Sequence, residues 1–274
     1  MTEGTGRTGG GDEAATAPDS WKAWHEQRTA TVEAPYGPLA LTGTHWLDDA
    51  TDGRIPAVAG RWEAAGDEVV LTATEEDGLS LDGRPFTGRA VLTADHAPPA
   101  EARLAQGERR LAVLRREGLW AVRVWDPDSA NRRAFAGIEA TPYSADWVLP
   151  GLYRPYAASR TVRVPNADGR DRGLGLAGEL AFHLAGDEHT LQVAEEEDGS
   201  LWAVFADTTS GTGSYRFRFL RPSAPGADGR VDVDFNRALL PPCAFAEHFI
   251  CPFPPPGNTL PIAVAAGERR ALTH

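Results

Sequence analysis

The chain has 274 residues, of which 42% are hydrophobic and 24% charged, with 29 glycines and 21 prolines. This composition is typical of a globular, turn-rich protein and excludes a disordered or fibrous one, and the length suits one large β domain or two smaller ones. The net charge of −12 at pH 7 makes the average surface repel phosphate, which argues against nucleic acid and anionic membranes as partners.

The N-terminal residues are rich in glycine, threonine, alanine and acid and show no apolar periodicity, so we expect a flexible tail over residues 1–18. They lack the apolar core of a signal peptide, and no stretch approaches the roughly 20 apolar residues that cross a bilayer. We therefore expect a cytoplasmic protein. In that compartment the two cysteines, Cys243 and Cys251, are expected to be reduced thiols.

The segment after the tail, DSWKAWHEQRTATVEA, predicts one short amphipathic helix. Asp19 or Ser20 is suited to cap its N-terminus. Trp21, Trp24 and Arg28 follow at helical spacing. We expect the two tryptophans to lie on the sheet that follows in the sequence.

From Pro38 onward, short alternating runs are separated by turn signals such as EEDG, APGADG and NADGRDRG, which predicts antiparallel strands. The runs are PLALTG, EVVLTA, RAVLTA, RRLAVLRR, LWAVRVW, RTVRVP, GELAFHL, HTLQVAE, LWAVFAD, SYRFRFL, RVDVDFN and PIAVA. We therefore expect a mainly β fold, an antiparallel β-barrel or β-sandwich with a short N-terminal helix. The chain divides most naturally near Pro150–Ser159, into regions 19–150 and 151–274, and one continuous domain over 19–274 also fits.

Two neighbouring runs carry a polar face. In SYRFRFL the aromatic residues alternate with Arg216 and Arg218, and in RVDVDFN the apolar residues alternate with Asp232, Asp234 and Asn236. If the two runs pair as a long hairpin, arginines and aspartates meet across the strands. That face is either a solvated sheet surface or the polar lining of a barrel or cleft.

The end of the second run, Asp234–Arg237, is named here the DFNR block. Asp234 and Asn236 share one face of the strand, and Arg237 follows where the strand should end, at a rim where binding groups collect. A carboxylate, an amide and a guanidinium together can position a polar substrate and stabilise an anion. Asp234, Asn236 and Arg237 are therefore the candidate catalytic residues, and an equally good alternative gives them a structural role in ion pairs and backbone contacts.

The two thiols flank His248 in CAFAEHFIC, a spacing that supplies at most three zinc ligands, with His45 or an acid as a fourth. No second cysteine pair or close histidine pair supports zinc, so we expect no metal and no cofactor. A disulfide between Cys243 and Cys251 is sterically possible. As a nucleophile Cys243 would need a base, and its apolar neighbours LLPPCAF should raise the pKa of the thiol and leave it inert.

The segment PFPPPGN, Pro252–Asn258, is named here the proline strap. Its fixed φ angles and missing amide donors make it stiff, so it can cover a sheet edge or a barrel mouth. We expect it to fold across the end of the sheet and to place the thiols against the DFNR block.

Several motifs together resemble the bacterial and archaeal proteins of the DUF1684 family of unknown function. They are FADTTSGTGSYRFRFL (205–220), DFNRALLPPCAF (234–245), CPFPPPGNTLPIAV (251–264), AGER (266–269) and, upstream, GPLALTGTHWL (37–47). The chain departs from the family pattern at Leu239 and Leu240, where a Tyr or Asn with Pro is common, and at His248, where an aromatic residue is usual. A role that depended on His248 would therefore not be a family property. The resemblance implies no particular reaction.

The leading hypothesis is a protein that holds a small polar or amphipathic molecule at a barrel or sheet rim. Its expected ligand-binding residues are Arg216, Arg218, Asp234, Arg237, Cys243 and His45. One alternative is a hydrolase or lyase that uses Asp234 as acid or base, with Asn236 and Arg237 stabilising the developing anion. Another is a structural or interaction module. The sequence leaves the ligand and the oligomeric state open.

Overall fold

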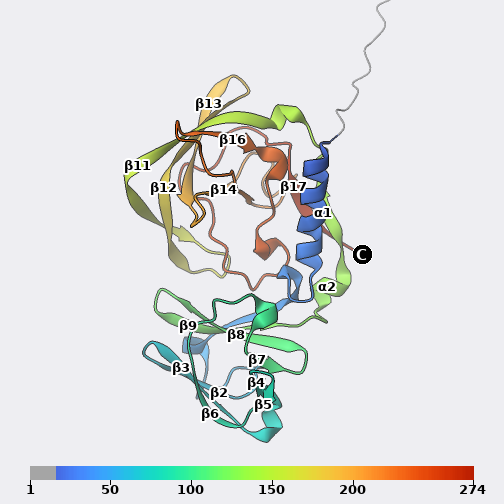
Figure 1. Ribbon diagram of the computed structural model, residues 1–274, viewed down its shortest axis with the longest axis vertical. Coiled ribbons are helices and arrows are strands. Elements are labelled where there is room, and N and C mark those ends of the chain that lie inside the picture. The colour runs from blue at the N-terminus through green and yellow to red at the C-terminus, as the bar shows by residue number, and fades with distance from the viewer. Residues whose placement is uncertain (1–16) are drawn as a thin grey trace, which may run out of the picture.

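A computed structural model describes residues 17–274 (Figure 1). The tail predicted for 1–18 therefore lies, apart from Ala17 and Pro18, outside the described residues. Within that part of the chain the elements are seventeen strands, two α-helices and seven short 3₁₀ turns. All paired strands are antiparallel. The mainly β fold with one short N-terminal helix is confirmed.

The N-terminal strands form two sheets that share one core. The six-stranded sheet has the order β1 (Leu41–Trp46), β9 (Leu119–Trp125), β8 (Arg109–Arg116), β7 (Leu104–Gln106), β4 (Leu79–Leu81) and β5 (Arg84–Pro85). The three-stranded sheet has the order β2 (Arg61–Ala65), β3 (Glu68–Ala73) and β6 (Gly88–Leu92). Trp62 and Leu71 from the small sheet and Val113 and Val122 from the large one pack in the same buried cluster, because alternate residues of each strand point inward.

The C-terminal strands form a second six-stranded sheet, with long strands at the centre (Figure 1). Its order is β15 (Arg218–Leu220), β14 (Leu201–Phe205), β13 (Asp187–Glu195), β12 (Asp171–Leu184), β11 (Val148–Pro165) and β16 (Arg230–Asp234). The segment Pro150–Ser159 lies inside β11. Phe182, Phe205 and Phe235 meet edge to face in the core of this sheet.

The helix α1, Asp19–Glu33, runs alongside the C-terminal part of the molecule (Figure 1). It begins after Pro18 and ends at Ala34, which is extended because Pro35 follows it. The Trp21 indole donates to the backbone carbonyl of Asn236 at 3.0 Å. The expectation that the tryptophans lie on the sheet following α1 was therefore wrong, since a helical pattern identifies the packing face but not its partner.

The runs SYRFRFL and RVDVDFN do not pair as the long hairpin that their connection would allow. β15 and β16 lie at opposite edges of the six-stranded sheet, where β15 pairs with β14 and β16 pairs with β11. The arginines and aspartates of these runs consequently do not face each other across paired strands. PIAVA forms no strand, and the carbonyl of its Val264 accepts a hydrogen bond from Arg218 instead.

A smaller pair of strands, β10 (Phe135–Ala140) and β17 (Glu268–Thr273), connects the middle of the chain with its end. It follows the short helix α2, Ala130–Ala134, which the Ser129 side chain caps by accepting the N–H of Arg132. No helix of the described residues is long and apolar enough to span a membrane. The cytoplasmic location stays a prediction.

Hydrogen bonds attach the proline strap to strands of the C-terminal sheet, and that it covers the end of the sheet stays a prediction. The N–H of Phe253 donates to the carbonyl of Pro165 at the end of β11, at 2.9 Å. Farther along, the buried Asn258 amide accepts from the N–H of Gln192 at 2.8 Å and donates to the carbonyl of Val204 at 2.9 Å. These bonds attach the strap to β11, β13 and β14 in turn.

Candidate functional site

The DFNR block forms a turn at the end of β16. Asp234 ends the strand, and Phe235–Arg237 make one 3₁₀ turn. The Asp234 carboxylate caps this turn by accepting the N–H of Asn236 at 3.0 Å, and it pairs with the Arg237 guanidinium at 3.2 Å. The structure thus brings together the three candidate catalytic residues. Their role in catalysis stays a prediction.

Asn236 uses its side chain to hold neighbouring backbone. Its amide is 1% exposed, donates to the carbonyl of Ser144 at 2.9 Å and accepts from the N–H of Ser144 at 3.0 Å. Arg237 lies with its guanidinium 5.4 Å from the ring centre of Trp24 on α1. The contacts of the block therefore join β16, the loop before β11 and helix α1.

Arg218 faces the protein interior. Its guanidinium donates to the Asp207 carboxylate and to the carbonyls of Val264 and Ala266. A second ion pair joins Arg28 of α1 to the buried Glu268 at 3.0 Å, and the other oxygen of Glu268 accepts the N–H of Leu240 at 2.7 Å. The expected polar sheet face carrying both Arg216 and Arg218 is therefore absent, because only Arg216 is exposed.

The two cysteines lie next to each other as free, buried thiols. The N–H of Cys243 donates to Sγ of Cys251 at 3.4 Å, and the Tyr215 hydroxyl lies 3.6 Å from Sγ of Cys243. None of these contacts involves a residue of the DFNR block. The expectation that the two thiols lie against that block was therefore wrong. The arrangement reflects the turn Pro242–Ala244, which directs Cys243 inward from the start of its segment.

These contacts lower the pKa of Cys243 to about 7, mainly through the hydrogen bond from the Cys251 thiol, with help from the Tyr215 hydroxyl and the positive charge of Arg216. Burial acts in the opposite direction. The pKa of Cys251 is raised, first by its bond to Cys243 and then by burial. The expectation that apolar neighbours alone set the pKa of Cys243 overlooked donors from other segments, Cys251 and Tyr215. Whether Cys243 is inert stays a prediction.

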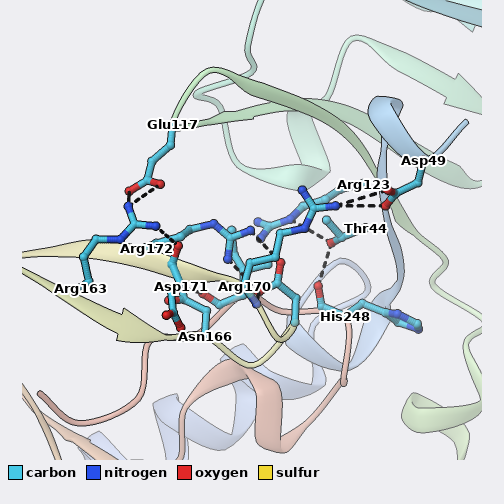
Figure 2. Close-up of polar contacts among 12 residues, drawn as sticks. Thr44, Asp49, Glu117, Arg123, Arg163, Asn166, Arg170, Asp171, Arg172 and His248 are labelled. Atoms are coloured by element: carbon cyan, nitrogen blue, oxygen red, sulfur yellow. Dashed lines mark hydrogen bonds and ion pairs between the residues drawn. The ribbon is translucent and has the colours of Figure 1, made fainter.

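The predicted histidine candidate, His45, lies on β1 near His248. Burial lowers the pKa of His45, and the charge of His248 lowers it further. The hydroxyl of the adjacent Thr44 donates to the backbone carbonyl of His248 at 2.7 Å (Figure 2). Within the described part of the chain, no three His, Cys, Asp or Glu side chains are arranged to hold a metal ion.

A polar cluster joins the N-terminal strands to β11 and β12 (Figure 2). Its ion pairs are Arg163 with Glu117 at 3.0 Å, Arg170 with Asp49 at 3.2 Å and Arg172 with Asp168 at 2.7 Å. The Trp46 ring also lies 4.9 Å from the guanidinium of Arg170 and 5.1 Å from that of Arg172. Each of these arginines is matched by a carboxylate.

Arg123 in the same region differs from these arginines. No carboxylate of residues 17–274 forms an ion pair with it, and its Nε donates only to the Thr44 hydroxyl, at 3.3 Å. Burial is the main reason that its pKa falls to about 10, and the charge of Arg116 adds to this shift. The guanidinium therefore stays charged at neutral pH.

Arg123 lines an apolar cavity of about 670 Å³. The cavity lies where the end of α1, the loop after it, β9 and the segment before Cys251 meet, and its walls are Thr31, Ala34, Pro35, Tyr36, Gly37, Pro38, Pro98, Pro99, Ala100, Arg123, Trp125 and Phe249. The guanidinium lies 5.5 Å from the ring centre of Phe249 and 6.0 Å from that of Trp125. A single unmatched cation on apolar walls can bind an anion that carries an apolar body.

Sequence analysis missed Arg123 as a candidate. The signal was present in LWAVRVW, where one arginine interrupts an otherwise apolar strand. Ala121, Arg123 and Trp125 alternate with buried valines, and because Ala121 and Trp125 are buried as well, the second face of β9 is largely covered and Arg123 is only partly exposed. A charged residue on a doubly covered strand needs either a partner or a ligand.

Comparisons with known proteins place the chain in a family. No curated protein matches it. The solution NMR structure of an uncharacterized protein from Haloarcula marismortui is similar, with 31% identity, a TM-score of 0.42, and coverage of 49% of this chain and 77% of that one. The model of the family described as Protein of unknown function (DUF1684) matches residues 133–269, half of the chain. The chain therefore belongs to the DUF1684 family.

Proposed function

We propose that the protein binds a small amphipathic anion, a carboxylate or similar acid on an apolar body, in the cavity beside Arg123. The observation that carries the proposal is the guanidinium of Arg123, which has no carboxylate partner among residues 17–274 and lines a cavity of about 670 Å³. That volume lies within the roughly 300–1,000 Å³ typical of small-molecule sites. The proposal keeps the ligand class expected from the sequence and moves the site from the DFNR block to Arg123.

Desolvation makes the cation a strong anchor. A half-buried guanidinium without a carboxylate partner among residues 17–274 has lost part of its hydration, which an incoming carboxylate can replace with two charge-assisted hydrogen bonds. The Thr44 hydroxyl accepts only one N–H of Arg123, at 3.3 Å. The remaining N–H donors are available to a ligand.

The walls determine which anions fit. Trp125 is buried and Phe249 packs beside it, while four prolines and Tyr36 complete an apolar surface. Such walls gain free energy from an apolar body, at about 25 cal/mol for each Å² removed from water. Inorganic phosphate offers no such body and should bind weakly.

Isothermal titration calorimetry tests the proposal. Aryl and short-chain alkyl carboxylates would be titrated into the full chain and compared with the corresponding neutral amides, which share the apolar body. Carboxylates should bind about tenfold tighter or better, equal to about 1.4 kcal/mol. Arg123→Gln should remove that preference, with circular dichroism confirming the fold.

Arg116→Gln is the matched control, because Arg116 is an exposed neighbour of the same charge. It should leave carboxylate binding nearly unchanged. Equal binding of acids and amides, or equal losses in the two variants, would reject the site.

The rival enzyme hypothesis for Asp234, Asn236 and Arg237 stays a prediction. The contacts favour a structural role, because Asn236 binds the backbone of Ser144 and Asp234 caps its own turn. Asp234→Asn separates the alternatives: loss of stability without any change in carboxylate binding supports anchoring. Loss of binding or turnover in a stable variant would restore the DFNR block as the site.

A further inference from the structure

Two thiols held side by side are the second reactive feature of the molecule. The N–H of Cys243 lies 3.4 Å from Sγ of Cys251, and the exposed fractions of the two residues are 7% and 6%. Seven residues separate them in the chain. The pair is therefore formed by folding rather than by a short sequence motif.

The segment between the thiols is fixed at three points. The carbonyls of Phe245, His248 and Ile250 accept hydrogen bonds from the side chains of Asn131 at 3.1 Å, Thr44 at 2.7 Å and Asn166 at 2.9 Å, respectively. These donors come from helix α2, strand β1 and the end of β11. Because both ends of the segment are held, the sulfurs stay close without a large rearrangement.

The surroundings of the two sulfurs differ. Cys243 faces the Tyr215 hydroxyl, at 3.6 Å, and the charge of Arg216, whereas Cys251 faces Cys243 and the charge of Arg123. Cys251 also has a donor and a cation nearby, because its Sγ accepts the N–H of Cys243, so the feature that favours the negative charge on Cys243 is the further hydrogen bond from the Cys251 thiol. The pKa values follow the same asymmetry, with that of Cys243 lowered to about 7 and that of Cys251 raised.

Small reagents have a route to this site. Cys243 lines a surface cavity of about 460 Å³ together with Thr42, Asn131, Glu247 and His248. Cys251 does not line this cavity. Of the two cysteines, Cys243 is therefore the one that borders a route from solvent.

We infer that Cys243 and Cys251 form a redox-active dithiol site that reacts with hydroperoxides, with Cys243 as the attacking thiolate and Cys251 as the resolving thiol. The Cys243 thiolate attacks the terminal peroxide oxygen, the O–O bond breaks, and hydroxide leaves from hydrogen peroxide or alkoxide from an organic hydroperoxide, which gives a sulfenic acid. The Cys251 thiol then attacks the Cys243 sulfur. A disulfide forms, one water leaves, and the peroxide has been reduced by the two thiols together.

Intact-mass measurement after treatment with hydrogen peroxide and an acid quench tests this inference. The wild type should lose two hydrogens and gain no oxygen. Cys251→Ser should instead accumulate a sulfenic acid at Cys243, captured by dimedone, while Cys243→Ser should leave Cys251 unmodified. The rate of the wild type should rise with pH around a midpoint near 7.

The variant Tyr215→Phe distinguishes a reactive thiolate at Cys243 from two thiols that are only adjacent. It keeps the aromatic ring and removes the hydroxyl that lies near Sγ of Cys243. It should move the midpoint of the rate profile to higher pH while circular dichroism shows an intact fold. The inference is overturned if the wild type stays a dithiol under peroxide that oxidises glutathione, if Cys243→Ser reacts as fast as Cys251→Ser, or if Tyr215→Phe leaves the profile unchanged. Carboxylate binding at Arg123 is measured separately, so either proposal can fail alone.

Discussion

The Arg218 guanidinium pairs with the Asp207 carboxylate at 2.5 Å, and the two side chains are 1% and 0% exposed. Both belong to the motif FADTTSGTGSYRFRFL. From β15, Arg218 also reaches the carbonyls of Val264 and Ala266, so it ties the sheet edge to the segment that follows the proline strap. A buried charge of this kind must keep its partner, because isolated it would cost several kcal/mol.

Arg218→Met should lower the free energy of unfolding by about 3 to 5 kcal/mol, since it leaves the Asp207 carboxylate buried and unpaired. Adding Asp207→Asn should recover part of this loss, which urea unfolding of the four members of a double-mutant cycle would reveal. The control is Arg230→Met, whose pair with Asp228 is 83% and 63% exposed. The control should change stability by less than about 1 kcal/mol, and a similar loss in both variants would contradict the prediction.

Removing the ion pair between Arg28 and Glu268 should loosen helix α1. Arg28→Met leaves the fully buried Glu268 with the N–H of Leu240 as its remaining donor, at a cost of about 1.5 to 3 kcal/mol. Hydrogen exchange of peptides covering 19–33 should accelerate in this variant. Lys22→Met, which removes an exposed pair with Asp19 on the same helix, should leave exchange unchanged.

Gly267 is expected to tolerate no side chain. Its φ is +74°, and an added Cβ would lie 2.6 Å from the carbonyl oxygen of Ala238 and 2.7 Å from that of Phe235. Gly211 has a similar φ of +81° with open space around it, so Gly211→Ala pays only the backbone cost of about 1 to 2 kcal/mol. Gly267→Ala should destabilise the protein well beyond that value in thermal unfolding. Equal effects would show that the carbonyls move aside.

The contact between Glu117 and β12 should be sensitive to acid. Hydrogen bonds from the N–H of Gly173, at 2.8 Å, and from Arg163 hold the pKa of Glu117 below its ordinary value of 4.5. Because the folded pKa is depressed, the stabilisation is fully present above pH 4.5 and is lost as the pH falls through the folded value. The amide resonance of Gly173 should titrate below pH 4.5 in the wild type and stay flat in Glu117→Gln.

Patterns within a few residues were sufficient to predict the element types. Helical spacing predicted α1, and alternation and turn residues predicted antiparallel strands. These features depend on local backbone preferences. A reader of the sequence can recover them without knowing what each segment touches.

Partners distant in the sequence could not be inferred in the same way. Alternation in SYRFRFL places Arg218 opposite the aromatic residues but cannot show that Asp207 and two carbonyls enclose it. Likewise the apolar neighbours of Cys243 suggest an inert thiol, and only the fold brings Tyr215 to it. LWAVRVW does mark Arg123 as an arginine in an apolar strand, but only the fold shows that no carboxylate of residues 17–274 pairs with it.

Three polar contacts of helix α1 are with residues more than 200 positions later in the chain, Asn236, Leu240 and Glu268. During synthesis, these three contacts cannot form until the residues from Asn236 to Glu268 have been made, although the C-terminal end of α1 can already contact Arg132. A ribosome-bound chain truncated before Asn236 would leave the apolar surface of Trp21 and Trp24 available to chaperones. The contact between helix α1 and strand β17 is thus formed late, because Arg28 can pair with Glu268 only after β17 has been synthesised.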